Sequence, residues 1–112
     1  MGYNVNYRGA LYFKDSLNEL DKFLGEDVRD HPDWKIPEGA ECYFIDWEKQ
    51  ANALVHNTAE KSYDGANQLR IILDNTKEVE LSGVIRYTDD YGGVGVINCI
   101  GREVEEKVLV KG

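Results

Sequence analysis

The chain has 112 residues, a formal net charge of −8, 42% hydrophobic and 30% charged residues, and seven tyrosines among its aromatic side chains. This length suits one domain, 1–112, and the aromatic content excludes a disordered chain. No apolar run approaches the roughly 20 residues of a membrane span, and no signal-peptide core follows Met1. We therefore expect a soluble, unexported protein whose two cysteines, Cys42 and Cys99, are buried thiols in a reducing cytoplasm.

The N-terminal residues are predicted to form a strand followed by a short helix. Residues 2–7 alternate between apolar or aromatic and asparagine side chains, which is typical of a half-buried strand, and Gly9 is a candidate bulge. Asp15 or Ser16 can cap the helix, and Gly25 is suited to end it. Four apolar residues in between recur at helical spacing: Leu17, Leu20, Phe23 and Leu24.

The next segment, residues 25–41, is called the connector and is predicted to be ordered but irregular. Pro32 and Pro37 exclude a helix through it, and Trp34 is a large apolar anchor. The connector lies within an acidic stretch, residues 14–48, in which 11 acidic and four basic side chains give a net charge of −7. The other 77 residues hold 10 acidic and nine basic side chains, a net of −1. Such polarisation favours a basic partner.

Two strands are expected after the connector. Residues 41–47 are apolar on both faces, which is typical of a central strand. A turn at 48–50 leads to a candidate partner strand at 52–57.

The clearest helical period of the chain lies in residues 61–76. Ser62 and Asp64 are both credible N-caps, while Gly65 weakens the first turn. The apolar stripe expected to pack on a sheet consists of Ala66, Leu69, Ile72 and Leu73.

The C-terminal part is predicted to be three strands. A strand at 79–87, interrupted at Gly83, and a strand at 94–100 form a hairpin across the loop 88–93, and a last strand covers 102–110. The order is then β-α-β-β-α-β-β-β. We predict an α+β fold in which two helices pack on an antiparallel sheet of about five to six strands.

Two stretches carry a resemblance to a known group of proteins. These are FLGEDVRDHPDW at 23–34 and EKSYD at 60–64, the latter followed by a helix and then LSGVIRYTDD. They resemble small uncharacterised proteins of tailed bacteriophages, which often begin Met-Gly-Tyr as this chain does. Residues 52–58, NALVHNT, depart from the Asp-Phe-Ser-Gly run of those relatives. The resemblance implies a phage genome, the cytoplasm of an infected bacterial host, and a host-takeover or counter-defence role.

The connector region is the candidate site, and three interpretations of it stay open. In one it is an acidic recognition surface for a partner, with an aromatic anchor. In another its aspartates and His31 ligate a divalent cation, although the glycine and glutamate of a Ca²⁺ loop are missing. In the third Asp30 caps a turn, Trp34 plugs the core edge and the other charges are solvated. The candidate partner-binding residues are Glu19, Glu26, Asp27, Asp30, Asp33 and Trp34.

Catalysis finds little support in the sequence. The serines occupy helix-cap or strand positions, and both cysteines lie in core-like runs. His31 and His56 can act as base and orienter only if the fold brings them together. The glycines at 92–95 indicate a hairpin turn and not a nucleotide-binding loop. We therefore expect no enzyme activity, no cofactor and no bound metal, and the scattered basic residues disfavour nucleic acid.

These inferences converge on one functional hypothesis. We expect a phage-encoded acidic protein that engages a basic surface of a host protein, such as a CRISPR or restriction nuclease, by occupying a site built for phosphates. The competing hypotheses are a small metal-dependent enzyme that uses the connector and an accessory protein of the virion or its assembly. No membrane partner is expected, and the hairpin tip at 89–92 has no assigned role.

Overall fold

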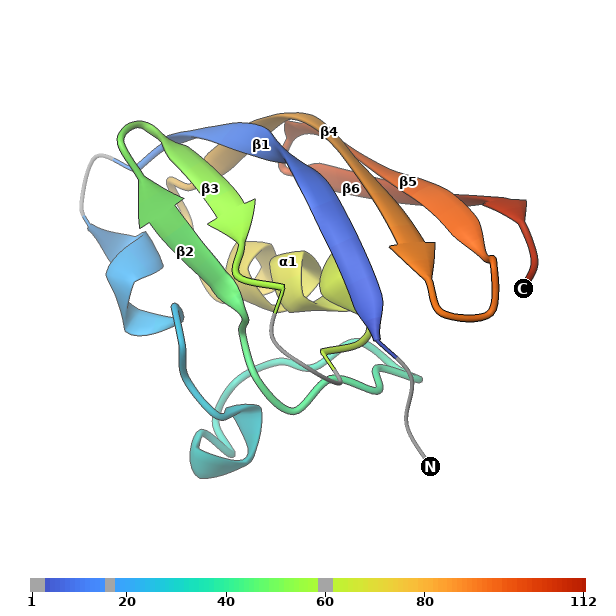
Figure 1. Ribbon diagram of the computed structural model, residues 1–112. Helices are drawn as coiled ribbons and strands as arrows, with labels where there is room; N and C mark the ends of the chain where they lie inside the picture. Colours follow the sequence, from blue (N-terminus) through green and yellow to red (C-terminus); the bar gives the residue numbers. More distant parts are fainter. Residues whose placement is uncertain (1–3, 16–17, 59–61) are drawn as a thin grey trace.

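A curved six-stranded sheet with one helix on its inner face forms the molecule (Figure 1). The structure is a computed structural model that describes residues 4–15, 18–58 and 62–112. All strand pairs are antiparallel, in the order β2-β3-β1-β4-β5-β6. The strands are β1 (Val5–Lys14), β2 (Trp47–Gln50), β3 (Ala53–His56), β4 (Glu80–Asp89), β5 (Val94–Gly101) and β6 (Glu103–Val110).

The helix α1 (Gly65–Asp74) provides the apolar surface that covers the sheet. All four residues of the predicted stripe are buried, which confirms that part of the sequence analysis. The carboxylate of its N-cap residue Asp64 makes no capping bond and instead accepts the backbone N–H of Glu41 at 2.7 Å. Among the described residues, no helix is long and apolar enough to cross a membrane.

The core lies between α1 and one face of β1, β4 and β5. Buried and accessible residues alternate along these strands, because successive side chains of a strand point to opposite faces. Burying each large aliphatic side chain contributes about 1.5–3 kcal/mol. The fully buried aliphatic residues on this face of the three strands are Leu11, Leu81, Ile85 and Ile97.

β1 and β4 approach each other closely at two glycines. A Cβ atom on Gly9 would lie 2.6 Å from the carbonyl oxygen of Val84, and one on Gly83 would lie 2.5 Å from that of Ala10. Both glycines have positive φ, 122° and 150°, which other residues rarely adopt. The β1–β4 register continues without a shift, so the expected bulge at Gly9 and the expected interruption at Gly83 are both wrong.

The prediction of two helices is wrong, since α1 is the only α-helix in the described part of the chain. The segment expected to form the first helix contains only a 3-10 turn, η1 (Glu19–Lys22). Asn18 adopts a left-handed conformation with φ of 54°, and a right-handed helix cannot continue through it. Asp15 nevertheless caps the turn by accepting the N–H groups of Glu19 and Leu20. Residues 16–17, which include the alternative cap Ser16, lie outside the described residues, as do 1–3 and 59–61.

The strand expected at 41–47 is also wrong. Only Trp47 belongs to a strand, because the backbone before it bonds to the connector, with an isolated bridge between Asp27 and Phe44. β2 pairs with β3 alone and is therefore an edge strand, not a central one. The residues expected to form the turn lie within β2, and the chain turns instead at Ala51 and Asn52. The partner strand is confirmed as β3.

The C-terminal strands agree with the sequence analysis. β4 and β5 form the expected hairpin, and β6 pairs with β5. The carboxylate of Asp89 closes the hairpin tip by accepting the N–H groups of Tyr91 and Gly93, both at 2.8 Å. Asp90 accepts the N–H of Asn4 at 2.8 Å, so the tip also holds the beginning of the described chain.

Candidate functional site

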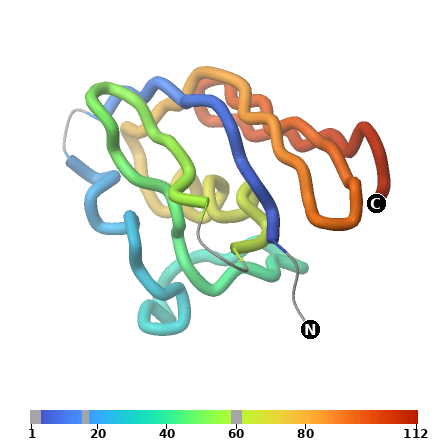
Figure 2. The backbone as a smooth tube through the Cα atoms, in the orientation of Figure 1, coloured from blue at the N-terminus to red at the C-terminus, as the bar shows by residue number. Residues whose placement is uncertain are grey.

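The connector begins after η1, passes below α1 and leads through residues 42–46 to β2 (Figure 2). Backbone hydrogen bonds hold its first part against the segment that precedes β2. Gly25 N–H donates to Ile45 at 2.8 Å, Ile45 N–H donates to Glu26 at 3.0 Å, and Val28 N–H donates to Tyr43 at 2.7 Å. This backbone is therefore ordered without belonging to the sheet.

Side-chain contacts hold the middle of the connector. The Trp34 ring stacks on His31, with centroids 4.0 Å apart and planes 4° from parallel, and lies 4.6 Å from Phe23. Lys35 exchanges two hydrogen bonds with the Asn75 amide at the end of α1, of 2.8 and 2.9 Å. Trp34 is consequently half-buried against the core and is not a freely projecting anchor.

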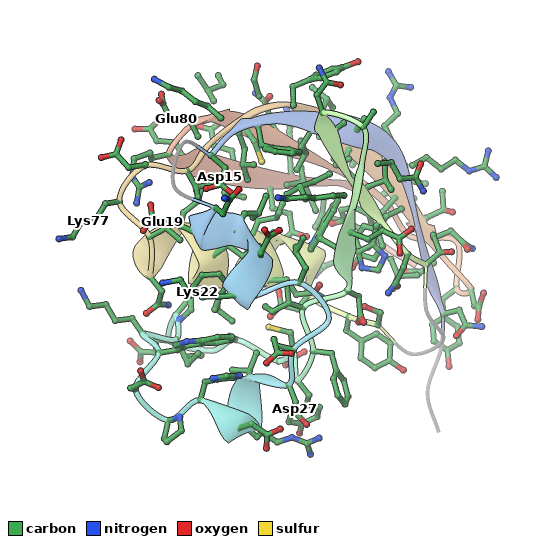
Figure 3. The ribbon with its side chains drawn as sticks, turned by 90° about the vertical axis from the view of Figure 1, so that its left-hand side faces the viewer. Asp15, Glu19, Lys22, Asp27, Lys77 and Glu80 are labelled. Carbon is green, nitrogen blue, oxygen red and sulfur yellow. The ribbon has the colours of Figure 1, made fainter. Side chains whose placement is uncertain are left out.

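The first candidate residue, Glu19, is used within the fold. Its carboxylate accepts the N–H groups of Glu78 at 2.8 Å and Lys77 at 3.1 Å, which tie η1 to the segment after α1. The hydrogen bond from Glu78 lowers the pKa of Glu19. Figure 3 shows Lys22 and Lys77 on the same side of the molecule as Glu19 and Asp27, so cations lie among the carboxylates on this side.

Two further candidates have local partners. Glu26 contacts the Nε2 atom of His31 at 3.0 Å. Asp27 binds the Arg29 guanidinium through both carboxylate oxygens, at 2.8 and 3.0 Å, and this contact lowers the pKa of Asp27. No group of three or more histidine, cysteine or acidic side chains in the described residues is placed to hold a metal ion. The structure thus does not support the cation interpretation of the connector.

The remaining candidates are free to meet a partner. Asp30 and Asp33 are exposed, and neither side chain has a hydrogen-bond or ion-pair partner in the described part of the chain. The exposed aromatic side chains of this region are Tyr43, 59% exposed, and Phe44, 45% exposed. The Arg29 guanidinium lies over both rings, 4.7 and 5.6 Å from their centroids. We call this group, Asp27, Arg29, Asp30, Tyr43 and Phe44, the connector surface.

A second cluster lies at the start of α1 and joins residues that are distant in the chain. The Ser62 hydroxyl donates to Asp46 at 2.5 Å and lies 3.2 Å from the Nε2 atom of His56. Gln68, on α1, donates to Ser62 at 3.2 Å and accepts the N–H of Asp46 at 2.8 Å. A serine, a histidine and an aspartate therefore meet, as they do in many hydrolases.

The hydrogen bonds of this cluster oppose catalysis by Ser62. The backbone N–H of Thr58 donates to Nδ1 of His56 at 2.9 Å, so in the neutral ring the proton resides on Nε2, the atom that faces Ser62. Burial lowers the pKa of His56 to about 4. A base that already carries its proton toward the serine cannot accept another at neutral pH. The cluster is best explained as a satisfied buried network.

Sequence reasoning missed this cluster because its members come from three separate segments. The sequence indicates a helix cap at Ser62, and no local spacing links this residue to Asp46 or His56. The two histidines make separate contacts, His31 with Glu26 and His56 with Ser62. Cys42 and Cys99 are buried free thiols, as expected, and burial raises the pKa of each to about 11.

Comparison with known proteins adds no further assignment. No protein family, no curated protein and no solved structure matches this chain. The fold and the connector define the class of this protein. It is an α+β protein with a six-stranded antiparallel sheet, one α-helix in the described part of the chain, and an ordered acidic connector.

Proposed function

We propose that this chain is a non-enzymatic binding protein that engages a basic surface of another protein through the connector surface and the acidic residues around it. The observation that carries the proposal is the connector itself. Irregular segments longer than about 12–15 residues are uncommon in small domains and are usually functional or disordered. This one contains only the short 3-10 helix η2 (Val28–Asp30), and it is held by backbone bonds at one end and by the stacked Trp34 in its middle.

An ordered connector favours binding for an energetic reason. Each side chain that must be immobilised on association costs about 0.5–1.5 kcal/mol, and a prearranged surface avoids part of that cost. Tyr43 and Phe44 provide rigid aromatic area, the kind of contact that dominates interface energies. Asp30 and Asp33 provide unpaired charge for steering a basic partner, while Glu19, Glu26 and Asp27 supply weaker steering because their carboxylates have local partners.

We infer the class of the partner from the resemblance to phage proteins. A protein made in an infected bacterium that presents carboxylates on an ordered segment is suited to occupy a phosphate-binding site of a host nuclease, such as a CRISPR or restriction enzyme. The resemblance of residues 23–34 supports this origin and this setting, the host cytoplasm.

The test is capture of host proteins followed by kinetics with the purified partner. Wild type should retain a basic protein, whereas the variant Asp30→Lys with Asp33→Lys should not. The matched control, Glu78→Lys with Glu80→Lys, makes the same charge change where the chain enters β4, outside the connector surface, and should retain the partner. The association rate should fall at least about tenfold between low and high salt. The proposal is contradicted by an association rate that does not change with salt concentration, or by a control variant that loses the partner as fully as the connector variant does.

A Tyr43→Ser variant tests the aromatic contribution separately. It changes no charge, so the salt dependence of association should persist while the complex dissociates about tenfold faster or more. Trp34 is a poor choice for this test, because its ring packs on Phe23 and replacing it would disturb the core.

A further inference from the structure

The face of the sheet opposite α1 is uncovered (Figure 1) and carries more apolar surface than a solvated face needs. Antiparallel sheets that face water on one side usually carry polar residues there. Here Ile100 is 68% exposed, Tyr12 57% and Val84 49%, and the three come from neighbouring strands β5, β1 and β4. An exposed apolar group of this kind, bordered by charges, is typical of an interaction site.

Strand register arranges this surface in three rows, because directly paired residues of antiparallel strands point to the same face. We call the twelve residues of these rows the open face. The first row is Arg8, Arg86, Val96 and Lys107, the middle row is Ala10, Val84, Asn98 and Glu105, and the third row is Tyr12, Ser82, Ile100 and Glu103.

The positive charges of the first row are not neutralised by the acidic side chains that the structure describes. Arg8 and Arg86 are directly paired across β1 and β4, although like charges opposite each other destabilise a sheet. Within the described residues, none of the three cations of this row has an ion-pair partner. Their arrangement is therefore not explained by the stability of the single chain.

We propose that the open face binds a second copy of this chain, with a two-fold axis that runs along the middle row. This axis exchanges the first and third rows, so each residue of one row meets its counterpart from the other copy. Arg8 then lies against Tyr12 of the second copy, Val96 against Ile100, and Lys107 against Glu103. These contacts are a cation over an aromatic ring, an apolar pair and an ion pair, and all three are favourable. The fourth pair is Arg86 with Ser82, whose hydroxyl oxygen can accept a hydrogen bond from the guanidinium.

The shape of the open face fits this occupant. A hollow of about 430 Å³ beside Arg8 and Arg86 can receive the Tyr12 ring of the other copy. The three rows span about five positions along each of four strands, which gives a face about 15 Å long and about 15 Å wide. That is about 225 Å² of flat area before side-chain relief is added, less than the roughly 500 Å² per copy of a stable specific interface, so the dimer is a weak one.

One contact of the proposed dimer is unfavourable, so removing it should strengthen the dimer. Glu105 ends the middle row and meets Glu105 of the second copy at the sheet edge, where water screens the repulsion. The connector lies on the far side of α1 from the open face (Figure 1), so dimerisation leaves the connector surface accessible. The inference therefore does not depend on the proposed function.

Sedimentation equilibrium of the full chain over a wide concentration range tests the proposal. Wild type should show a concentration-dependent monomer–dimer equilibrium. Lys107→Glu and Glu103→Lys should each raise the dissociation constant about tenfold, and the double variant should restore it, because the ion pair reforms with reversed signs. Glu105→Gln should lower it. The control Tyr43→Ser, on the connector surface, should leave it unchanged.

Two results would overturn the inference. One is a chain that stays monomeric at every concentration. The other is a dimer that the single charge reversals leave intact or that the double variant does not rescue. Val84→Asp provides a second disruption at the centre of the face, with circular dichroism to confirm folding. Saturable binding of single-stranded oligonucleotide by wild type, lost in Arg86→Ala, would assign the face to a polyanion and would also count against the dimer.

Discussion

The backbone N–H of Gly65 donates a hydrogen bond to the hydroxyl oxygen of Tyr7 at 3.0 Å, across 58 positions of sequence. The Tyr7 ring also fills the space beside Gly65, where a Cβ atom would lie 2.7 Å from the ring. The first residue of α1 is thereby placed directly against β1, and the helix is held by the sheet at the end where its N–H groups lack helical partners.

This contact predicts that Gly65→Ala destabilises the protein. Alanine is normally better than glycine in a helix by about 1 kcal/mol. Here the added methyl group overlaps the Tyr7 ring, and overpacking of this kind costs about 1–3 kcal/mol. Urea unfolding should therefore show a net loss of stability. Asp74→Ala, at the exposed end of the same helix, should change the free energy of unfolding by less than about 0.5 kcal/mol. A stabilised Gly65→Ala protein would show that the contact is loose.

The burial of His56 predicts that the protein loses stability in mild acid. Burial among Tyr7, Trp47 and Ser62 lowers the pKa of His56 to about 4, although Asp46 opposes this shift, whereas an unfolded histidine has a pKa near 6.5. The unfolded chain therefore binds the proton more readily, so stability is full above about pH 6.5 and falls as the pH drops toward 4. We expect His56 to account for about 2–3 kcal/mol of this loss.

The measurement compares two proteins at two pH values. Urea unfolding of wild type and of His56→Gln at pH 7.5 and pH 4.5 separates His56 from the carboxylates that titrate in the same range. Wild type should lose more stability than the variant between these values. Equal losses in both proteins would mean that His56 accepts a proton in the folded state without cost.

The hydrogen bonds of Arg102 predict that replacing it with lysine destabilises the protein. Its guanidinium donates to the carbonyl oxygens of Leu73 at 2.5 Å, Thr76 at 2.6 Å and Val79 at 2.8 Å, and so joins the end of α1 to the beginning of β4. A lysine ammonium cannot reach three carbonyl groups in this planar arrangement. Arg102→Lys should therefore cost about 1.5–3 kcal/mol in urea unfolding. Arg29→Lys, which weakens an exposed pair with Asp27, should cost less than about 1 kcal/mol.

The local features of the chain were readable from the sequence wherever one periodicity dominated. The stripe of α1 and the hairpin of β4 and β5 follow from helical and alternating spacing, and both are present. The first predicted helix failed because apolar spacing says nothing about Asn18, whose left-handed backbone directly precedes the 3-10 turn η1 and prevents a continuous right-handed helix across this position. The strand at 41–47 failed because apolar alternation does not reveal what the backbone bonds to, and here it bonds to the connector.

The candidate site was found only in part. Composition located the acidic stretch, but it did not show that Asp27 binds Arg29, that Glu26 contacts His31 or that Trp34 packs inward. The apolar pattern of residues 41–47 predicts a strand, whereas Tyr43 and Phe44 lie outside the sheet and are exposed. Pairings of this kind depend on where distant segments meet, which no local pattern records.

The sequence by itself determined the net charge, the alternation of the C-terminal strands and the apolar stripe of α1, because each depends on residue type and on spacing within one segment. Only the tertiary structure decided which of these residues share a surface. It placed Ser62 between Asp46 and His56, and it aligned Arg8, Arg86 and Lys107 in one row of the sheet. Strand order and register set those neighbours, and both arise from long-range packing and not from local propensity.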